Sequence, residues 1–175
     1  MEYERNRAKL ALYKAQINPH FLFNTLNTLY VLLITQSDKT EVTLEHFINQ
    51  TKYMYNNANW EFIPLTEEVD YIGQYIALQQ LRLNELADFR FTHDVEREGI
   101  PIPPMMLITF VKNAFKYGIS SNDPCFIHIR LSQQADKLYF EVTNSTFDRE
   151  VKSSGRMGIK NCHRRLELLY PDTTV

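Results

Sequence analysis

Pro19 interrupts a long stretch of helical periodicity near the N-terminus. Apolar residues recur at helical spacing on both sides of it: Leu10, Tyr13 and Ile17 before, and Phe23, Leu26, Tyr30 and Leu33 after. A proline inside a helix removes one backbone donor and usually kinks the helix axis. The pattern therefore predicts one helix over residues 4–35, with a kink at Pro19 where His20 projects.

Beyond His20 the predicted helix is apolar around most of its circumference. Its apolar residues are Phe21, Leu22, Phe23, Leu26, Leu29, Tyr30, Val31, Leu32, Leu33 and Ile34. A helix that is apolar on all sides is buried, commonly between other helices. A polar loop at 36–39 precedes a second predicted helix with an apolar face: Leu44, Phe47, Ile48, Met54 and Tyr55. One chain supplies too few helices to enclose the first, so residues 1–60 are predicted to form a helical hairpin that pairs into a dimeric four-helix bundle.

Residues 61–175 carry a different pattern, in which helical and strand signals alternate. We expect helices over 66–86, 105–118 and 157–170, a strand over 89–95, and a hairpin of strands 126–131 and 138–142 with its turn at 133–136. Gly118 is interpreted as a left-handed helix terminator. This order of elements predicts an α+β sandwich with helices on one face of a mixed sheet.

Composition and charge limit the classes of function. The formal net charge of -2 gives no global electrostatic case for nucleic acid, so a helical DNA-binding module ranks last among the alternatives. Cys125 and Cys162 lie far apart without metal-ligand spacing, which favours buried thiols in a reducing compartment. The run from Phe21 to Ile34 is broken by polar residues and is too short to span a bilayer, and the N-terminus is charged rather than signal-like.

The run K-A-Q-I-N-P-H-F-L-F-N-T-L-N, residues 14–27, resembles the phosphoacceptor motif of LytS-like sensor histidine kinases. A lone histidine in an interface helix is more often a core or surface residue, but this match is long and ungapped. The resemblance implies that the imidazole of His20 accepts a phosphoryl group. Attack requires an unprotonated ring nitrogen, which the ordinary pKa of histidine supplies near neutral pH. Asn24 lies one turn further on and is interpreted as orienting His20 or a hydrolytic water.

A second run, F-V-K-N-A-F-K-Y-G at residues 110–118, resembles the N-box helix of GHKL-type ATPases. The resemblance implies that the amide oxygen of Asn113 holds Mg²⁺ against the phosphates of ATP, and such oxygens suit a hard cation that takes few protein ligands. Lys116 lies one turn on along the same face, where an ammonium can meet phosphate. Without the resemblance, an amphipathic helix with an exposed Asn and Lys would explain these residues. Lys112 stands where family members usually have Glu, and we expect this charge reversal beside the phosphates to tighten nucleotide binding and weaken turnover.

The adenine side of the predicted nucleotide site is matched at the strand end E-V-T-N-S, residues 141–145. The family pattern has an Asp there, followed by glycines, and that Asp accepts a hydrogen bond from the adenine amino group. Asn144 takes its place without the charge and can accept through its amide oxygen. A simple turn residue explains Asn144 about equally well from the residues alone.

Residues 154–170 resemble the glycine-rich lid and the helix that follows it. The resemblance implies that Gly155 and Gly158 let backbone donors approach phosphates near a helix N-terminus. Arg156 stands where the pattern prefers Gly. Basic residues follow that are either phosphate partners or a solvated helix face, and for the last of them the face is favoured: Lys160, Arg164 and Arg165.

These resemblances imply the cytoplasmic core of a dimeric two-component sensor kinase, with ATP and Mg²⁺ as cofactors and a response regulator as partner. Sensory or membrane segments are expected upstream of this chain. The GHKL-type domain, residues 61–175, is expected to be C-terminally truncated, because that fold usually closes with one or two more strands. The alternative is a non-catalytic dimerisation and docking scaffold with a degraded ATP site, which Lys112, Asn144 and Arg156 favour.

Overall fold

The computed structural model describes residues 19–57, 60–95, 100–135, 137–147 and 154–170. The chain divides into two compact units, one of Met1–Glu61 with Gly73–Arg82 and the other of Phe62–Ile72 with Leu83–Val175. Helix α4, Leu65–Gln80, contributes its first half to the second unit and its second half to the first. The predicted helix over residues 4–18, and with it the kink where that helix meets Pro19, lies outside the described residues.

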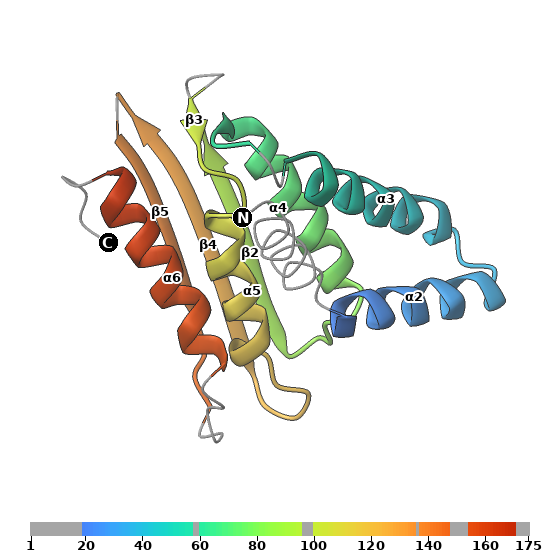
Figure 1. Ribbon diagram of the computed structural model, residues 1–175. Coiled ribbons are helices and arrows are strands. Elements are labelled where there is room, and N and C mark those ends of the chain that lie inside the picture. The colour runs from blue at the N-terminus through green and yellow to red at the C-terminus, as the bar shows by residue number, and fades with distance from the viewer. Residues whose placement is uncertain (1–18, 58–59, 96–99, 136, 148–153, 171–175) are drawn as a thin grey trace. The chain divides into compact units, whose positions relative to one another are not determined.

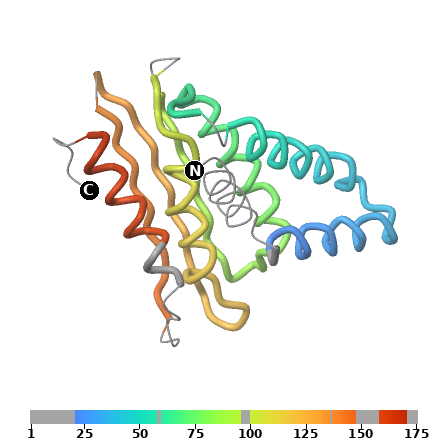
Figure 2. Tube along the Cα trace, viewed as in Figure 1, coloured from blue at the N-terminus to red at the C-terminus, as the bar shows by residue number. Residues whose placement is uncertain are grey.

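The first unit contains two consecutive helices that contact each other, α2 (Pro19–Ile34) and α3 (Thr40–Asn57). Figure 2 traces the short connection between them, residues 35–39. Gln36 adopts a left-handed φ of 51°, which lets the chain reverse within this connection. The ring of Phe21 stacks on Tyr75 from the second half of α4, with ring centroids 5.4 Å apart.

Much of the apolar surface of α2 and α3 is exposed in the single chain. Phe23 is 64% exposed and Tyr55 is 82% exposed. The other large apolar residues exposed on the two helices are Leu26, Tyr30, Val31, Leu33, Ile34, Val42, Leu44 and Ile48. Thr25 and Leu29 are the buried residues of α2 among its described side chains. A single chain therefore leaves many apolar side chains of α2 and α3 exposed, as is typical of helices that pack against a partner.

The second unit is built on a three-stranded mixed sheet in the order β2-β4-β5. Strand β2 (Ala87–Asp94) is parallel to β4 (Cys125–Gln134), and β4 is antiparallel to β5 (Lys137–Asn144). Short strands β1 (Ile63–Pro64) and β3 (Pro101–Ile102) pair separately. Helices α5 (Leu107–Gly118) and α6 (Ser154–Leu169) complete the unit. The prediction of an α+β fold with a mixed sheet is confirmed.

One face of the sheet forms a core with α5, which packs against β4 and β5 with α6 at its side (Figure 1). Burial alternates along β4, whose residues Cys125, Ile127, Ile129 and Leu131 all point to this face. Aromatic contacts extend the core from both edge strands. Phe89 of β2 meets Phe115 of α5 at 5.6 Å between centroids, and Phe140 of β5 meets Phe110 at 6.2 Å.

Some predicted boundaries were wrong, and the local contacts explain why. The helix expected over 66–86 ends at Gln80, and the side chain of Asn84 then accepts from the Leu86 amide and donates to the carbonyl of Ser121. The hairpin turn expected at 133–136 is shorter than predicted, because the strands continue to the pair of Gln134 with Lys137. Ala135 supplies the left-handed φ of 52° in that turn, and buried Gln133 donates to its carbonyl. Helix α6 begins at Ser154 rather than at Met157.

The carboxylate of Glu68, fully buried at 0% exposure, caps the N-terminus of α5 from α4. Its Oε2 accepts from the Met105 amide at 2.9 Å, and its Oε1 accepts from the amides of Leu107 and Ile108 at 3.0 and 3.2 Å. A helix N-terminus leaves its first N–H groups without partners and carries a partial positive charge. A carboxylate at this end accepts hydrogen bonds from those N–H groups and balances the positive charge. Met105 holds a left-handed φ of 60°, and the bond to Glu68 stabilises this uncommon conformation.

Gly118 ends α5 as predicted, but for a different physical reason. It lies within the helix rather than in a left-handed cap, and Ile119 after it is extended. A Cβ at position 118 would lie 2.7 Å from Cβ and 2.9 Å from Nδ2 of Asn144, at the end of β5. Glycine is thus required by the close approach of helix and strand.

No helix within the part of the chain that the structure describes has the length and apolar character needed to cross a bilayer.

Replacing Glu68 by Gln should lower the free energy of unfolding by about 2 kcal/mol, because a hydrogen-bonded carboxylate becomes an amide whose NH₂ group faces backbone donors. Urea denaturation of the purified chain measures the change. Glu67→Gln on the exposed side of the same helical turn is the matched control, and we expect its effect to stay within about 0.5 kcal/mol. Equal effects of the two substitutions would show that the cap is energetically unimportant.

Two glycines in helices should respond oppositely to alanine. Gly73→Ala, where an added Cβ meets nothing within 4 Å, should raise the free energy of unfolding by about 0.5–1 kcal/mol through helix propensity. Gly118→Ala should lower it by about 1–3 kcal/mol through overpacking against Asn144. Thermal and urea unfolding measure both variants. Adding Asn144→Gly should recover part of the second loss, and a stabilised Gly118→Ala variant would contradict the close approach.

Candidate nucleotide site along helix α5

Helix α5 presents Thr109 and Asn113 on one face, because residues four apart lie one above the other. Asn113 is half-buried. Lys116, exposed, lies three residues further on, with its Nζ 5.0 Å from the centroid of the Tyr117 ring. This face therefore carries an amide and a cation within one turn of helix, as the sequence predicted.

Helix α6 brings Gly158 to the same face. A Cβ on Gly158 would lie 3.8 Å from Cγ2 of Thr109, so the backbone of α6 lies in ordinary contact distance of the turn before Asn113. The packing continues toward the N-terminus of α5, where Cys162 Sγ lies 3.0 Å from Met106 Sδ and 3.4 Å from its carbonyl. Burial raises the pKa of the Cys162 thiol to about 11, so the sulfur stays neutral. These contacts set the register of α6 on α5.

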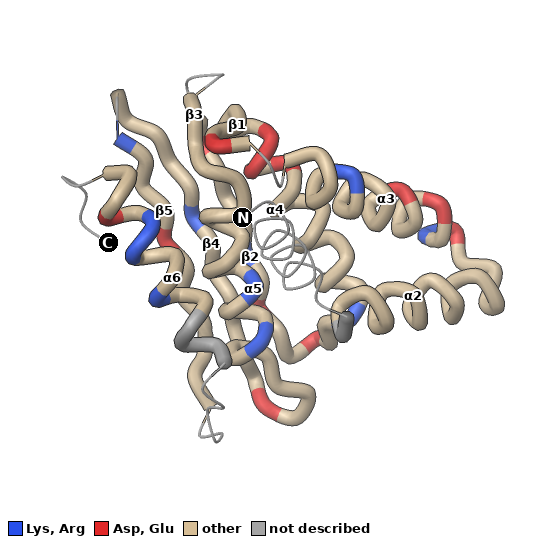
Figure 3. Tube along the Cα trace, in the orientation of Figure 1, with Lys and Arg blue, Asp and Glu red and all other residues tan. Residues whose placement is uncertain are grey.

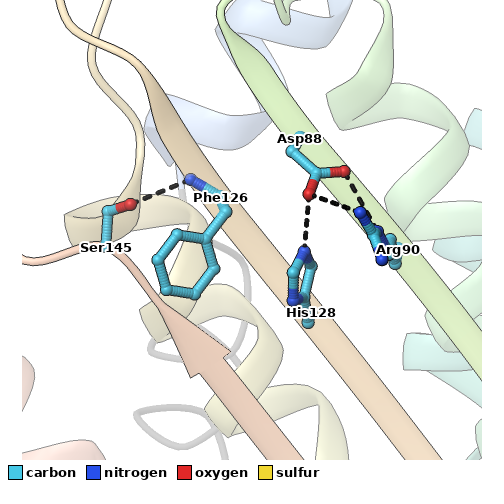
Figure 4. Close-up of polar contacts among 5 residues, drawn as sticks. All are labelled: Asp88, Arg90, Phe126, His128 and Ser145. Carbon is cyan, nitrogen blue, oxygen red and sulfur yellow. Dashed lines mark hydrogen bonds and ion pairs between the residues drawn. The ribbon is translucent and has the colours of Figure 1, made fainter.

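Strand β5 brings Asn144 to the C-terminal end of α5, against Gly118. The Asn144 Nδ2 donates to the carbonyl of Ser145 at 2.6 Å, which fixes the orientation of the amide. Ser145 is itself tied to the sheet, since its Oγ accepts from the amide of Phe126 at 2.9 Å (Figure 4). An amide oriented in this way offers its oxygen as an acceptor.

Three of the predicted residues thus lie on or against α5, although not on one face of it. Gly158 lies beside Thr109, Asn113 follows one turn later, and Asn144 lies beside Gly118. Gly118 lies nine residues after Thr109, about 14 Å further along the axis and about half a turn around it, so Gly158 and Asn144 contact opposite sides of α5. Basic residues gather on α5 and α6 (Figure 3), among them exposed Lys160 and Arg164.

The remaining predicted site residues lie in the other unit or have side chains that the structure does not describe. His20 and Asn24 lie in α2, and they belong to the other unit of the chain. The side chain of His20 lies outside the description, whereas Asn24 is half-buried and its carbonyl accepts from Thr28 Oγ1 at 3.0 Å. Gly155, expected in a lid loop, falls in the first turn of α6.

Lys112 does not face the same way as Asn113. Its Nζ donates to the hydroxyl of Tyr71 on α4 at 3.4 Å and lies 5.7 Å from the centroid of that ring. Burial lowers the pKa of Lys112 to about 8, and the negative charge of Glu68 opposes the shift. Adjacent helical residues point about 100° apart, which explains how Lys112 meets α4 while Asn113 does not. The sequence led us to expect the Lys112 charge beside the phosphates. These contacts direct it toward α4 instead.

The residues present suit Mg²⁺ and ATP chemically. The Asn113 amide supplies the hard oxygen ligand that Mg²⁺ accepts, and Lys116 supplies a cation on the same helix. Among the described residues there is no group of three or more His, Cys, Asp or Glu side chains that would hold a metal alone. Mg²⁺ commonly takes few protein ligands and completes its shell with phosphate and water, so a single amide is compatible with it.

The structure also contains a charged cluster that the sequence analysis missed. On the outer face of the sheet, Asp88 Oδ2 lies 2.9 Å from His128 Nε2 and 3.0 Å from an Arg90 nitrogen (Figure 4). The hydrogen bond from His128, and then that from Arg90, lowers the pKa of the Asp88 carboxyl. The cluster borders a shallow depression that includes Phe126 and Pro124. Alternation along β2 and β4 places these residues outward, but only the strand register brings Asp88 and His128 together.

The sequence model of the family described as "Histidine kinase" matches residues 8–87. The sensor protein LytS of Bacillus subtilis is 29% identical over 139 residues, which cover 79% of this chain and 23% of that protein. LytS of Bacillus cereus is 27% identical over 139 residues, covering 79% of this chain and 24% of that protein.

The sensor protein kinase HptS of Staphylococcus aureus is 27% identical over 169 residues, covering 89% of this chain and 32% of that protein. The chain thus spans between 23% and 32% of the length of these curated relatives. The similarity to each of them runs through most of this chain and includes both units of the structure. Over most of its length, the chain is therefore similar in sequence to LytS-like sensor histidine kinases.

Proposed function

We propose that this chain is the phosphoacceptor and ATP-binding core of a two-component sensor kinase. The observation that supports it best is the packing of Gly158 against Thr109, one turn before Asn113 on the same face of α5, because the family resemblance assigns Gly158 and Asn113 to one nucleotide site. In this proposal Asn113 holds Mg²⁺, which screens the charge of the phosphates. Lys116 and Lys160 contribute cations, and Asn144 accepts from the adenine amino group.

The phosphoryl transfer requires one nucleophile and little covalent chemistry from the protein. A neutral ring nitrogen of His20 donates its lone pair to the γ-phosphorus of ATP, the bond from that phosphorus to the bridging oxygen breaks, and ADP leaves. Positioning and charge stabilisation supply most of the rate in such reactions. Asn24, one turn beyond His20 in α2, orients the imidazole or a hydrolytic water. The phosphoryl group then passes to an aspartate of a response regulator.

A second copy of the chain completes the proposed kinase. The exposed apolar side chains of α2 and α3 need cover, and two hairpins packed together give a four-helix bundle. The core lies on the cytoplasmic side in this proposal, with sensory or membrane segments upstream of it.

The contacts of Lys112 favour a second candidate, a dimerisation and docking scaffold without catalysis. Family members usually have Glu at this position, and here the side chain instead packs against Tyr71. A chain that lacks the acid and has Asn in place of the adenine-binding Asp keeps the helices of the family while losing turnover. The two candidates differ in whether His20 becomes phosphorylated.

Calorimetric titration of Mg-ATP tests the nucleotide site. Asn113→Ala should weaken binding by at least about tenfold, because it removes an oxygen ligand for the metal. Asn122→Ala, an exposed loop substitution in the same unit, is the control and should leave binding unchanged. If neither the parent chain nor a chain extended at its C-terminus binds Mg-ATP, the scaffold replaces the kinase as the proposed function.

Incubation with ATP labelled at the γ-phosphate tests the acceptor. The parent chain should incorporate acid-labile label, and His20→Gln should abolish it because no other residue is proposed as the nucleophile. His46→Gln on α3 is the matched control and should retain the label. Undiminished label in His20→Gln would move the acceptor to another residue.

A further inference from the structure

The ammonium of Lys112 is held by α4. Its Nζ donates to the Tyr71 hydroxyl at 3.4 Å, and Tyr71 lies one turn along α4 from Glu68, whose negative charge opposes the lowering of the Lys112 pKa by burial. Tyr71 is 1% exposed and Glu68 is 0% exposed, so both partners lie in the interior of the second unit. The ammonium of Lys112 therefore interacts with buried groups of α4 rather than with solvent alone.

The carboxylate of Glu68 has a demanding role of its own. It accepts three backbone hydrogen bonds from the start of α5, at Met105, Leu107 and Ile108. A buried charge is costly unless an opposite charge and hydrogen bonds accompany it. The three N–H groups supply hydrogen bonds, and Lys112 supplies the positive charge, one turn along α5 from Ile108.

We propose that Lys112 is a positioning residue: with Tyr71 it stabilises the carboxylate of Glu68, and through that carboxylate it fixes the N-terminal turn of the helix that bears Asn113. The link to nucleotide chemistry rests on the proposed function, whereas the cluster itself does not. Lys112, at the position where the family usually has an acid, thus helps to hold the start of α5 in place. Lys112→Glu therefore places a second carboxylate near Glu68 instead of restoring catalysis.

Hydrogen exchange of the Leu107 and Ile108 amides, followed by NMR without nucleotide, tests the cluster directly. Lys112→Met, which keeps the length of the side chain but removes its charge, should speed their exchange by about tenfold, a typical coupling within one network of charges and hydrogen bonds. Lys112→Arg should restore most of the protection. Lys116→Met, on the exposed side of the same helix, should leave exchange at both amides unchanged.

The same substitutions in a Glu68→Gln background distinguish positioning from general packing. If Lys112 acts through Glu68, Lys112→Met should cause no further increase of exchange once the carboxylate is gone. Equal increases in both backgrounds, no increase in either, or failure of Lys112→Arg to restore protection would overturn the proposal. Because ATP is absent, a chain that fails to bind nucleotide can still show the coupling, so the two proposals fail separately.

Discussion

The hydrogen bonds from the start of α5 to the buried carboxylate of Glu68 are the interaction on which the position of that helix depends. The carboxylate satisfies three amides at the start of α5 and stabilises Met105 in a left-handed conformation that few non-glycine residues adopt. The cap comes from α4, since the side chain of Met106 at the N-cap makes no capping hydrogen bond of its own. The start of the helix that carries Asn113 is thus determined by a residue 37 positions earlier in the chain than Met105.

From that start, α5 acts as the element against which the rest of the candidate site is assembled. Cys162 fixes α6 beside Met106, and this register brings Gly158 to Thr109. At the other end, the missing side chain of Gly118 admits Asn144. Each of these contacts packs one element of the unit against another, whether or not a ligand binds there. The candidate site is therefore positioned by the core of the unit, as rigid sites generally are.

Sequence similarity to a family and the chemistry of this chain are separate questions. The relatives named as sensor proteins show what the chain is similar to, but three residues depart from the pattern of the family that it resembles: Lys112, Asn144 and Arg156. The structure accounts for two of these differences. Lys112 packs against Tyr71 near Glu68, and Asn144 fits the space at Gly118, with its amide held by Ser145. Arg156 has no structural account.

The sequence by itself determined the α+β class, the mixed sheet and most element positions, because the periodicity of apolar residues is a local property of the chain. The helix that bears Asn113 was predicted within two residues of its observed start. Local signals failed where a distant residue decides, as at Asn84, which bonds Ser121. They also misplaced the ends of the hairpin strands, which continue to the pair of Gln134 with Lys137. Tertiary structure alone decided that Glu68 caps α5, that Lys112 points to α4, and that Asp88 meets His128. These contacts join residues about 40 positions apart, and their geometry follows from the packing of helix on helix and strand on strand, which no local pattern encodes.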